Sequence, residues 1–338
     1  MNNLENLYKL GLNQELEKEF NNYEGYSLAR VSVQYRNIYK IETNSGEMLA
    51  TVCGKLKYEL DNKEDYPAVG DWVVFKSEDN SNAIIYKILK RKTKICRKVA
   101  GAKSDEQILA TNVDKIFITM SLNNDFNLRR LERYINIAWD SGATPVIILT
   151  KADLCKDLED KLEDIESVCI GMDVIVVSSV SGEGINSVKD YICSSDTVVF
   201  IGSSGVGKST LINKLLNKEI QLTKDIGEND KGRHTTTHRE LFVLESGGVI
   251  IDTPGMRELQ LSQGDLESTF KDIEEIAREC RFSDCKHKSE PGCAVKKSIE
   301  DGMISKERFK SYEKLQRELI YAEKRRKSKE RKAKAYKR

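Results

Sequence analysis

The sequence has few of the features that mark linkers, secreted scaffolds or membrane spans. Its 338 residues include only four prolines, which argues against a proline-rich linker. No apolar run approaches the roughly 18 residues of a membrane-spanning helix, so we expect no membrane association. The first residues show no basic segment followed by an apolar one. We therefore expect no secretory signal and a cytoplasmic protein of two or three domains.

Histidine is scarce and cysteine is unevenly spread. Five of the eight cysteines are scattered, and we interpret them as reduced packing residues: Cys53, Cys96, Cys155, Cys169 and Cys193. The other three lie beside a histidine in the pattern C-x4-C-x-H-x5-C: Cys280, Cys285, His287 and Cys293. Three thiols and one imidazole form a tetrahedral Zn²⁺ ligand set with no open position. The segment therefore predicts one structural zinc ion.

The formal net charge of +1 conceals a strong asymmetry. Residues 324–338 contain ten basic residues and one acidic residue, a net charge of +9, so the rest of the chain carries −8. Such a run is either a solvated, disordered end or an arm that binds phosphates. Its place after the cysteine-rich segment favours RNA phosphates, and the helix before it can continue into the tail.

Residues 27–97 predict a small β-barrel. Five short β-like runs, such as SLARVSVQ and GDWVVFKS, are separated by turns rich in Asn, Gly, Asp and Ser. Barrels of this size, including OB-folds, commonly bind oligonucleotides. A fragment of a β-sandwich, or a barrel without a ligand, is the alternative, because no face of aromatic and basic residues can be identified from the sequence alone.

After residue 112, apolar runs alternate with helical patterns, which predicts an α/β domain with a mostly parallel sheet. The stretch GSSGVGKS fits G-x-x-x-x-G-K-[ST] between an apolar strand and a helix. Its glycines let backbone N–H groups surround phosphates, Lys208 reaches the outer phosphates, and Ser209 ligates Mg²⁺. The predicted nucleotide contacts here are Gly202, Ser203, Ser204, Gly205, Val206, Gly207, Lys208, Ser209 and Thr210.

Downstream, the strand GVIID ends in Asp252 of a D-T-P-G motif. Its carboxylate can hold Mg²⁺ directly or through water, and the N–H of Gly255 can approach a γ-phosphate. Three threonines lie between the two elements: Thr235, Thr236 and Thr237. One of these hydroxyls can complete the Mg²⁺ shell while the γ-phosphate remains, and the spacing favours Thr237, although each can also be a surface hydroxyl.

A guanine-recognition motif precedes the phosphate loop. The residues Thr150, Lys151, Ala152 and Asp153 follow the apolar run PVIIL. The Asp153 carboxylate can accept hydrogen bonds from N1–H and the 2-amino group of guanine, which adenine lacks, and the Lys151 stem can pack along the base. Farther on, Ser178 and Ser179 can supply a backbone N–H to the guanine oxygen. Together with the phosphate loop, these residues predict a guanine-nucleotide site.

This motif order resembles a Ras-like GTPase whose sequence is circularly permuted, which is tolerable where domain termini lie close together. Thr150 stands where asparagine is usual, so we expect guanine selectivity with moderate affinity. Met256 stands where many GTPases place a water-orienting glutamine, so intrinsic hydrolysis should be slow. His234 in the switch segment is the nearest replacement, and its alternative is a solvent-facing loop histidine.

Across essentially its whole length, the chain resembles the ribosome small-subunit-dependent GTPase A family. The supporting stretches are PAVGDWV, TKADL, GSSGVGKSTLIN, GRHTTTHREL, DTPGMRE and CRFSDCKHKSEPGC. We therefore expect an OB-fold RNA-binding barrel at 1–98, a circularly permuted P-loop GTPase domain at 99–258, and a helical zinc-binding domain with a basic tail at 259–338. The family also has a switch-segment histidine proposed as catalytic, which matches His234.

The resemblance implies a bacterial cytoplasmic factor that binds the small (30S) ribosomal subunit and its rRNA late in maturation. It also implies a hydrolase that converts GTP to GDP and phosphate, stimulated by the subunit; we expect a monomer. Three other functions fit the motifs. One is a GTPase acting on another RNA, such as tRNA or the large subunit. A second is a module that binds GTP with negligible turnover. The third is an ATP-using P-loop enzyme, against which Asp153 argues.

Overall fold

The computed structural model describes residues 4–60, 63–79, 81–98, 106–217, 239–253 and 266–336. The predicted site residues His234, Thr235, Thr236, Thr237 and Gly255 lie outside these ranges, as does Met256. The chain divides into two compact units. Unit 1 comprises residues 1–126 and 141–260, and unit 2 comprises residues 127–140 and 261–338.

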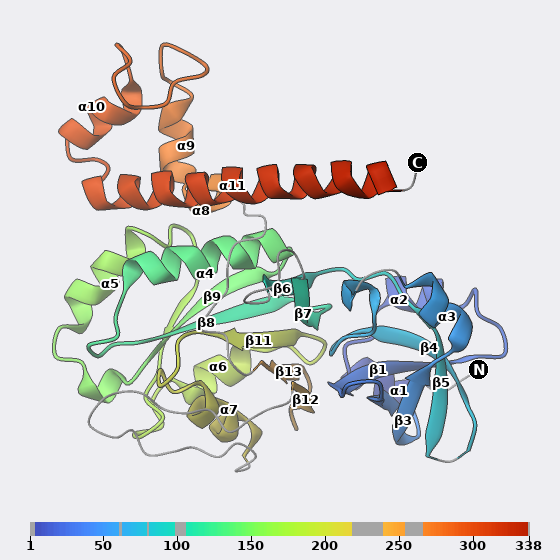
Figure 1. Cartoon of the computed structure of the whole chain (residues 1–338). Helices are drawn as coiled ribbons and strands as arrows, with labels where there is room; N and C mark the ends of the chain where they lie inside the picture. The colour runs from blue at the N-terminus through green and yellow to red at the C-terminus, as the bar shows by residue number, and fades with distance from the viewer. Residues whose placement is uncertain are drawn as a thin grey trace. The chain divides into compact units, whose positions relative to one another are not determined.

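Unit 1 begins with two short helices and a closed barrel of five strands (Figure 1). The strands follow the order β1-β2-β3-β5-β4, and β4 pairs back to β1, which closes the barrel as predicted. The elements are α1 (Glu5–Lys9), α2 (Gln14–Phe20), β1 (Ser27–Gln34), β2 (Tyr39–Thr43), β3 (Gly46–Val52), α3 (Gly54–Glu59), η1 (Lys63–Asp65), β4 (Trp72–Ser77) and β5 (Asn82–Ile88). Alternate apolar residues of these strands form the barrel core.

The hydrogen-bonded sheet continues from the barrel into a mostly parallel sheet in the order β1-β12-β13-β11-β8-β9-β10. The elements are β8 (Lys115–Ser121), β9 (Thr144–Thr150), η2 (Ala152–Leu154), α5 (Leu158–Glu166), β10 (Val174–Val176), α6 (Ile185–Tyr191), β11 (Thr197–Ile201), α7 (Lys208–Leu216), β12 (Glu240–Val243) and β13 (Val249–Asp252). One pair, Val33 with Glu240, joins barrel strand β1 to β12. A separate ribbon of β6 (Lys94–Lys98) and β7 (Glu106–Thr111) spans the predicted domain boundary at residue 98.

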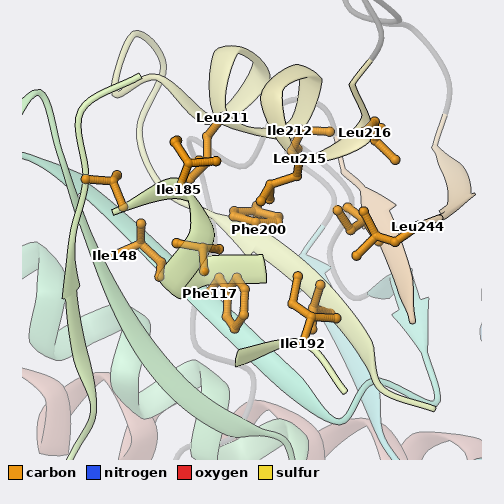
Figure 2. Packing of buried hydrophobic residues seen from close by; sticks show 14 of the residues in the cluster. Phe117, Ile148, Ile185, Ile192, Phe200, Leu211, Ile212, Leu215, Leu216 and Leu244 are labelled. Carbon is orange, nitrogen blue, oxygen red and sulfur yellow. The ribbon is translucent and has the colours of Figure 1, made fainter. Parts of the chain in front are cut away.

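Two helices cover one face of the parallel sheet. Figure 2 shows side chains from α6 and α7 packed on β8, β9 and β11, with the edge-to-face pair Phe117 and Phe200 near the centre. The ring centroids of this pair are 5.1 Å apart. The central strands β8, β9, β11 and β13 are short, largely buried apolar runs, as expected when a parallel sheet is covered, whereas the outer strands β10 and β12 are only partly buried. This packing fixes the carboxyl ends of the strands, where the predicted nucleotide motifs lie.

A buried arginine fastens the barrel to the parallel sheet within unit 1. The Arg30 guanidinium donates hydrogen bonds to the carbonyl oxygens of Leu10, Gly70 and Asn112. Arg30 is only 1% exposed, and its burial lowers the pKa to about 10, so the group stays cationic at neutral pH. One charge therefore satisfies carbonyl groups from the N-terminal helices, the barrel and the β7–β8 connection.

Unit 2 combines a helix from the middle of the sequence with the C-terminal helices. Its elements are residues 128–140 of α4 (Leu128–Ser141), α8 (Leu266–Thr269), α9 (Lys271–Ala277), α10 (Ala294–Glu300) and α11 (Lys306–Tyr336). The buried Phe270 packs edge-to-face on Tyr312, with ring centroids 5.5 Å apart. The helix α11 continues through most of the basic tail, to Tyr336. Within the described ranges, no helix combines the length and apolarity needed to cross a membrane.

Candidate nucleotide and metal sites

The phosphate loop lies between β11 and α7, at the carboxyl end of a central strand. Gly202 has φ +151°, and a Cβ added there would lie 2.2 Å from the carbonyl oxygen of Thr119 on the neighbouring strand β8. Gly205 and Gly207 have φ values of +81° and +98°, which favour glycine. The glycines of this motif are therefore required both by conformation and by the close approach of backbone.

The predicted phosphate-binding lysine is held against the loop. Lys208 is 8% exposed, and its Nζ donates to the carbonyl oxygens of Gly202 at 2.7 Å and Ser203 at 2.5 Å. The remaining predicted residues of this stretch flank it in the loop and the first turn of α7: Ser204, Val206, Ser209 and Thr210. The arrangement places an ammonium group and a helix N-terminus beside one loop, which is suited to polyphosphate.

The acidic end of a neighbouring strand lies beside this loop. Asp252 ends β13, which runs parallel to β11 with Ile251 opposite Val199. Asp252 is only 8% exposed. Because the carboxyl ends of parallel neighbours meet at one edge of a sheet, the carboxylate and the phosphate loop share that edge. This is the placement expected for a carboxylate that holds Mg²⁺ beside a bound nucleotide.

Thr150 tethers the predicted guanine motif to the phosphate loop. It ends β9, is 2% exposed, and its hydroxyl lies 2.5 Å from the carbonyl oxygen of Val206. The backbone N–H of Leu122 also donates to the carbonyl oxygen of Thr150 at 2.9 Å. At this position, where asparagine is usual, the hydroxyl of Thr150 therefore contacts the backbone of the phosphate loop.

Asp153 is oriented by a serine from the next strand end. Ser178 is fully buried, and its hydroxyl donates to Oδ1 of Asp153 at 2.6 Å. The Ser178 oxygen accepts backbone N–H groups from Val180 at 3.3 Å and Ser181 at 3.2 Å. The sequence predicted a backbone role here, and the side-chain role was missed because it depends on the pairing of β9 with β10. The half-buried Ser179 follows in the same loop.

Lys151 and Ala152 complete the turn that presents Asp153. Lys151 has φ +59°, in the left-handed region, and Ala152 donates its N–H to the carbonyl oxygen of Val177 at 3.2 Å. The Asp153 side chain is exposed at the rim, where a base can reach it. Two strand ends thus fix an exposed carboxylate that is suited to accept hydrogen bonds from the donors of guanine, which adenine lacks.

Replacing Thr150 with valine is expected to weaken GDP binding at least about fivefold, because one buried hydrogen bond to Val206 contributes about 1 kcal/mol and its loss leaves a carbonyl unpaired. Fluorescence titration with a labelled GDP measures the change. The matched control is Thr150→Ser, which keeps the hydroxyl and should bind within about twofold of wild type. Equal affinities for the valine and serine variants would contradict a tethering role.

The predicted metal ligands converge in unit 2. The ligand atoms of Cys280, Cys285, His287 and Cys293 all lie within 4.8 Å of one another. The Sγ atoms of Cys280 and Cys293 are 3.9 Å apart, and Nδ1 of His287 lies 3.6 and 3.4 Å from them. Zinc–ligand lengths of 2.3 Å for sulfur and 2.0–2.1 Å for nitrogen give tetrahedral edges of about 3.8 and 3.6 Å. The three separations among Cys280, His287 and Cys293 are close to these edges, so the cluster is compatible with one tetrahedrally bound Zn²⁺.

Glu290 shapes the loop that carries His287, a role that no pattern in the sequence indicates. Its carboxylate accepts backbone N–H groups from Lys286 at 3.2 Å, Lys288 at 2.8 Å and Ser289 at 2.9 Å. The backbone N–H of Glu290 itself, together with these three N–H groups, lowers the pKa of Glu290 to about 2. The turn between them holds His287 at φ +56°, and burial lowers the pKa of His287, which favours the neutral imidazole that metals bind.

Comparisons with known proteins agree with this geometry. The sequence profile of the RsgA GTPase family matches residues 88–262. The small ribosomal subunit biogenesis GTPase RsgA 2 of Lactiplantibacillus plantarum is 50% identical over 317 residues, covering 94% of this chain and 90% of the relative. RsgA 1 of Oceanobacillus iheyensis is 49% identical over 315 residues, covering 91% and 90%.

Solved structures share the fold. The crystal structure of YjeQ from Thermotoga maritima matches with a TM-score of 0.66 and 24% identity, covering 87% of this chain and 99% of YjeQ. YloQ, described as a circularly permuted GTPase, matches with a TM-score of 0.63 and 24% identity, covering 88% and 96%. The rotated motif order, the strand-end placement of the motifs and the profile match together show that this chain is a GTPase of the RsgA family.

Proposed function

We propose that this protein binds the small ribosomal subunit and hydrolyses GTP to GDP and phosphate late in the subunit's maturation, with the subunit stimulating hydrolysis. The observation that carries the proposal is that a phosphate loop, a D-T-P-G motif and a T-K-A-D motif occur together on a chain that is 50% identical to a protein named a small ribosomal subunit biogenesis GTPase. Hydrolysis would then act as a release signal. A cytoplasmic location and contact with rRNA follow from that role.

The nucleotide site needs a divalent cation, and we propose Mg²⁺ held by Ser209, Asp252 and Thr237. The buried carboxylate of Asp252 at the strand end beside the phosphate loop supports this assignment. Magnesium would neutralise charge on the phosphates. The Cys280–Cys293 cluster is proposed to hold one structural zinc ion, supported by ligand-atom separations close to tetrahedral edges.

For the barrel, we propose an RNA-contacting surface formed by Tyr26, Lys76 and Tyr86. Tyr26 precedes β1, and its ring centroid lies 5.2 Å from that of Tyr86 on β5. Nζ of Lys76 on β4 lies 4.4 Å from the Tyr26 ring centroid. Tyr86 is 37% exposed, and Lys76 is exposed. An aromatic pair beside a cation on adjacent strands suits stacking of an unpaired base and contact with its phosphate.

Replacing Tyr86 with alanine is expected to lower affinity for single-stranded RNA at least about fivefold, because stacking on an aromatic contributes about 1–3 kcal/mol per base. Fluorescence anisotropy of a labelled oligonucleotide at constant salt measures it. The control is Tyr58→Ala, which removes a tyrosine that is 91% exposed on α3 of the same barrel. Equal losses in both variants would exclude a specific role for the Tyr26–Tyr86 pair.

The test of the proposed function is phosphate release from GTP and from ATP, alone and with purified small subunits, large subunits or tRNA. We expect slow release from GTP alone and strong stimulation by small subunits only. Stimulation by large subunits or tRNA would assign the protein to another RNA, and absence of turnover would indicate a GTP-binding module. Equal turnover of ATP would overturn the guanine assignment made to Asp153.

We also propose His234 as the group that orients the attacking water, on the sequence argument that Met256 cannot do so. His234→Ala is expected to reduce subunit-stimulated hydrolysis at least about a hundredfold, which is within the range lost with a catalytic acid–base group. GDP affinity should stay within about twofold of wild type. Unchanged stimulated turnover in this variant would remove His234 from the mechanism.

A further inference from the structure

The helix α4 follows β8 and precedes β9, yet it belongs to the C-terminal unit. Residues 127–140 group with residues 261–338, while the strands on either side of the helix belong to unit 1. The side chain of Asn127 caps the helix by accepting the N–H of Arg130 at 3.0 Å. A helix that the sequence order assigns to the nucleotide-binding sheet is therefore packed with the unit that carries the cysteine cluster.

A fully buried carboxylate on α4 accounts for this assignment. Glu132 has no exposed surface, and Oε1 accepts a hydrogen bond from Nη1 of Arg308 on α11 at 3.0 Å. Its Oε2 accepts the hydroxyl of Ser311, one turn farther along α11. Arg129 donates to the same carboxylate at 2.9 and 3.0 Å from within α4. A buried carboxylate satisfied on both oxygens is costly to separate from its partners.

Arg308 connects three helices of unit 2. Besides Glu132, it donates from Nε and Nη2 to both oxygens of Asp272 on α9 at 2.7 Å, and from Nη2 to the Thr269 carbonyl at the end of α8 at 3.3 Å. Arg308 is 5% exposed. Burial alone would lower its pKa, but hydrogen bonding and charge from Asp272 and Glu132 raise it above the usual value. The guanidinium is therefore a permanent cation shared by α4, α8 and α9.

Two stretches of chain connect the predicted nucleotide motifs to helices that Arg308 contacts. One leaves β8 at Leu122, which is hydrogen-bonded to Thr150 of the guanine motif, and enters α4. The other leaves Asp252 at the end of β13 and reaches α8, the next described helix, which ends at Thr269. The two meet again in unit 2, where Nδ2 of Asn136 on α4 donates to Oγ1 of Thr269 at 3.2 Å.

We propose that Arg308 is a coupling residue that makes α4, α8 and α9 respond together to the nucleotide, so that the guanine and phosphate ends of the site act jointly on the cysteine-bearing unit. The proposal concerns how the state of the bound nucleotide affects the cysteine-bearing unit, and its biological meaning rests on the proposed function. Its physical basis is separate: one buried cation binds helices that the chain connects to two different nucleotide motifs. Arg308 touches no nucleotide motif and is not a catalytic residue.

Hydrogen–deuterium exchange of the full-length protein, bound to GDP and then to a non-hydrolysable GTP analogue, tests this coupling. In the wild type, amides of α4 and α9 should change exchange rate in the same direction, by at least about threefold. The Arg308→Lys variant keeps the charge but loses the branched guanidinium. In this variant the exchange rates of α4 amides should still change between the two nucleotide states, whereas those of α9 amides should change less than about 1.5-fold. An unchanged α9 response in this variant would overturn the proposal, as would a wild-type response confined to one helix.

The matched control is Arg133→Gln. Arg133 also joins α4 to α11, through Glu318 at 2.9 and 3.0 Å, but its side chain is 27% exposed, and such surface pairs contribute little. In Arg133→Gln the exchange rates of α9 amides should change as much as in the wild type; a loss as large as in Arg308→Lys would overturn a specific role for Arg308.

If Arg308→Lys does not fold, Asp272→Asn replaces it, with the same expectations. Because no ribosomal subunit is used, a failure of the proposed function leaves this result interpretable.

Discussion

Replacing Gly202 with alanine is expected to weaken GDP and GTP binding at least about a hundredfold, equivalent to about 2.7 kcal/mol. The added Cβ would lie 2.2 Å from the backbone oxygen of Thr119, a contact that no side-chain rotation can relieve. Either the loop or β8 must move, and β8 is fixed by parallel pairing on both sides and by the buried core around Phe117. The displaced part is therefore the phosphate loop, whose carbonyl at Gly202 also holds Lys208.

The control for this prediction is Gly171→Ala. Gly171 also has a positive φ of +71°, but a Cβ there meets nothing within 4 Å. This variant isolates the conformational cost of alanine, about 1 kcal/mol of folding stability, without an effect on the nucleotide. Isothermal titration with GDP and thermal unfolding of both variants separate the two effects. Nucleotide affinity in Gly202→Ala within threefold of wild type would contradict the close-packed geometry of the loop.

The parts of the site that the sequence predicted are those built from local pattern. Glycines at fixed spacing before a lysine, and an aspartate at the end of an apolar run, carry their chemistry wherever the sheet places them. Parallel pairing then brings the carboxyl ends of β9, β11 and β13 to the same side of the sheet, as the alternation of strands and helices predicted. The four predicted metal ligands could also be identified from the sequence, because they lie within one short segment.

What the sequence could not predict depends on partners that are distant in the chain. From the sequence, Glu132 would be placed on the polar face of an amphipathic helix between two strands. Its burial depends on Arg308, which lies 176 residues away in the chain. Val33 and Glu240 join the barrel to the parallel sheet through one bridge. Tyr26, Lys76 and Tyr86 come together only because β1, β4 and β5 close the barrel. Cys53 was interpreted as a packing residue, but its sulfur also accepts the N–H of Leu56 and caps α3.

Replacing Cys293 with serine is expected to reduce bound zinc from about one ion per protein to less than a tenth, and to unfold the cysteine-bearing part of unit 2. Cys293 is 7% exposed, and its sulfur lies 3.4 Å from Nδ1 of His287 and 3.9 Å from Sγ of Cys280. It also accepts the N–H of Lys296 at 3.4 Å, which caps α10. Structural zinc contributes about 10–16 kcal/mol in small zinc domains, so its loss exceeds what a few short helices can offset.

The measurements for Cys293→Ser are metal content by atomic emission and the rate of limited proteolysis between α9 and α10. The control is Cys193→Ser, which removes an exposed thiol outside the cluster and should retain both zinc and protease resistance. GDP affinity should stay within about threefold in both variants, because the described nucleotide motifs lie in unit 1 and the four ligands lie in unit 2. A wild-type protein purified without metal, yet as resistant to protease as the metal-loaded form, would contradict a structural ion: the cluster would then be held by packing such as the edge-to-face contact of His287 with Phe309, whose ring centroids are 6.1 Å apart.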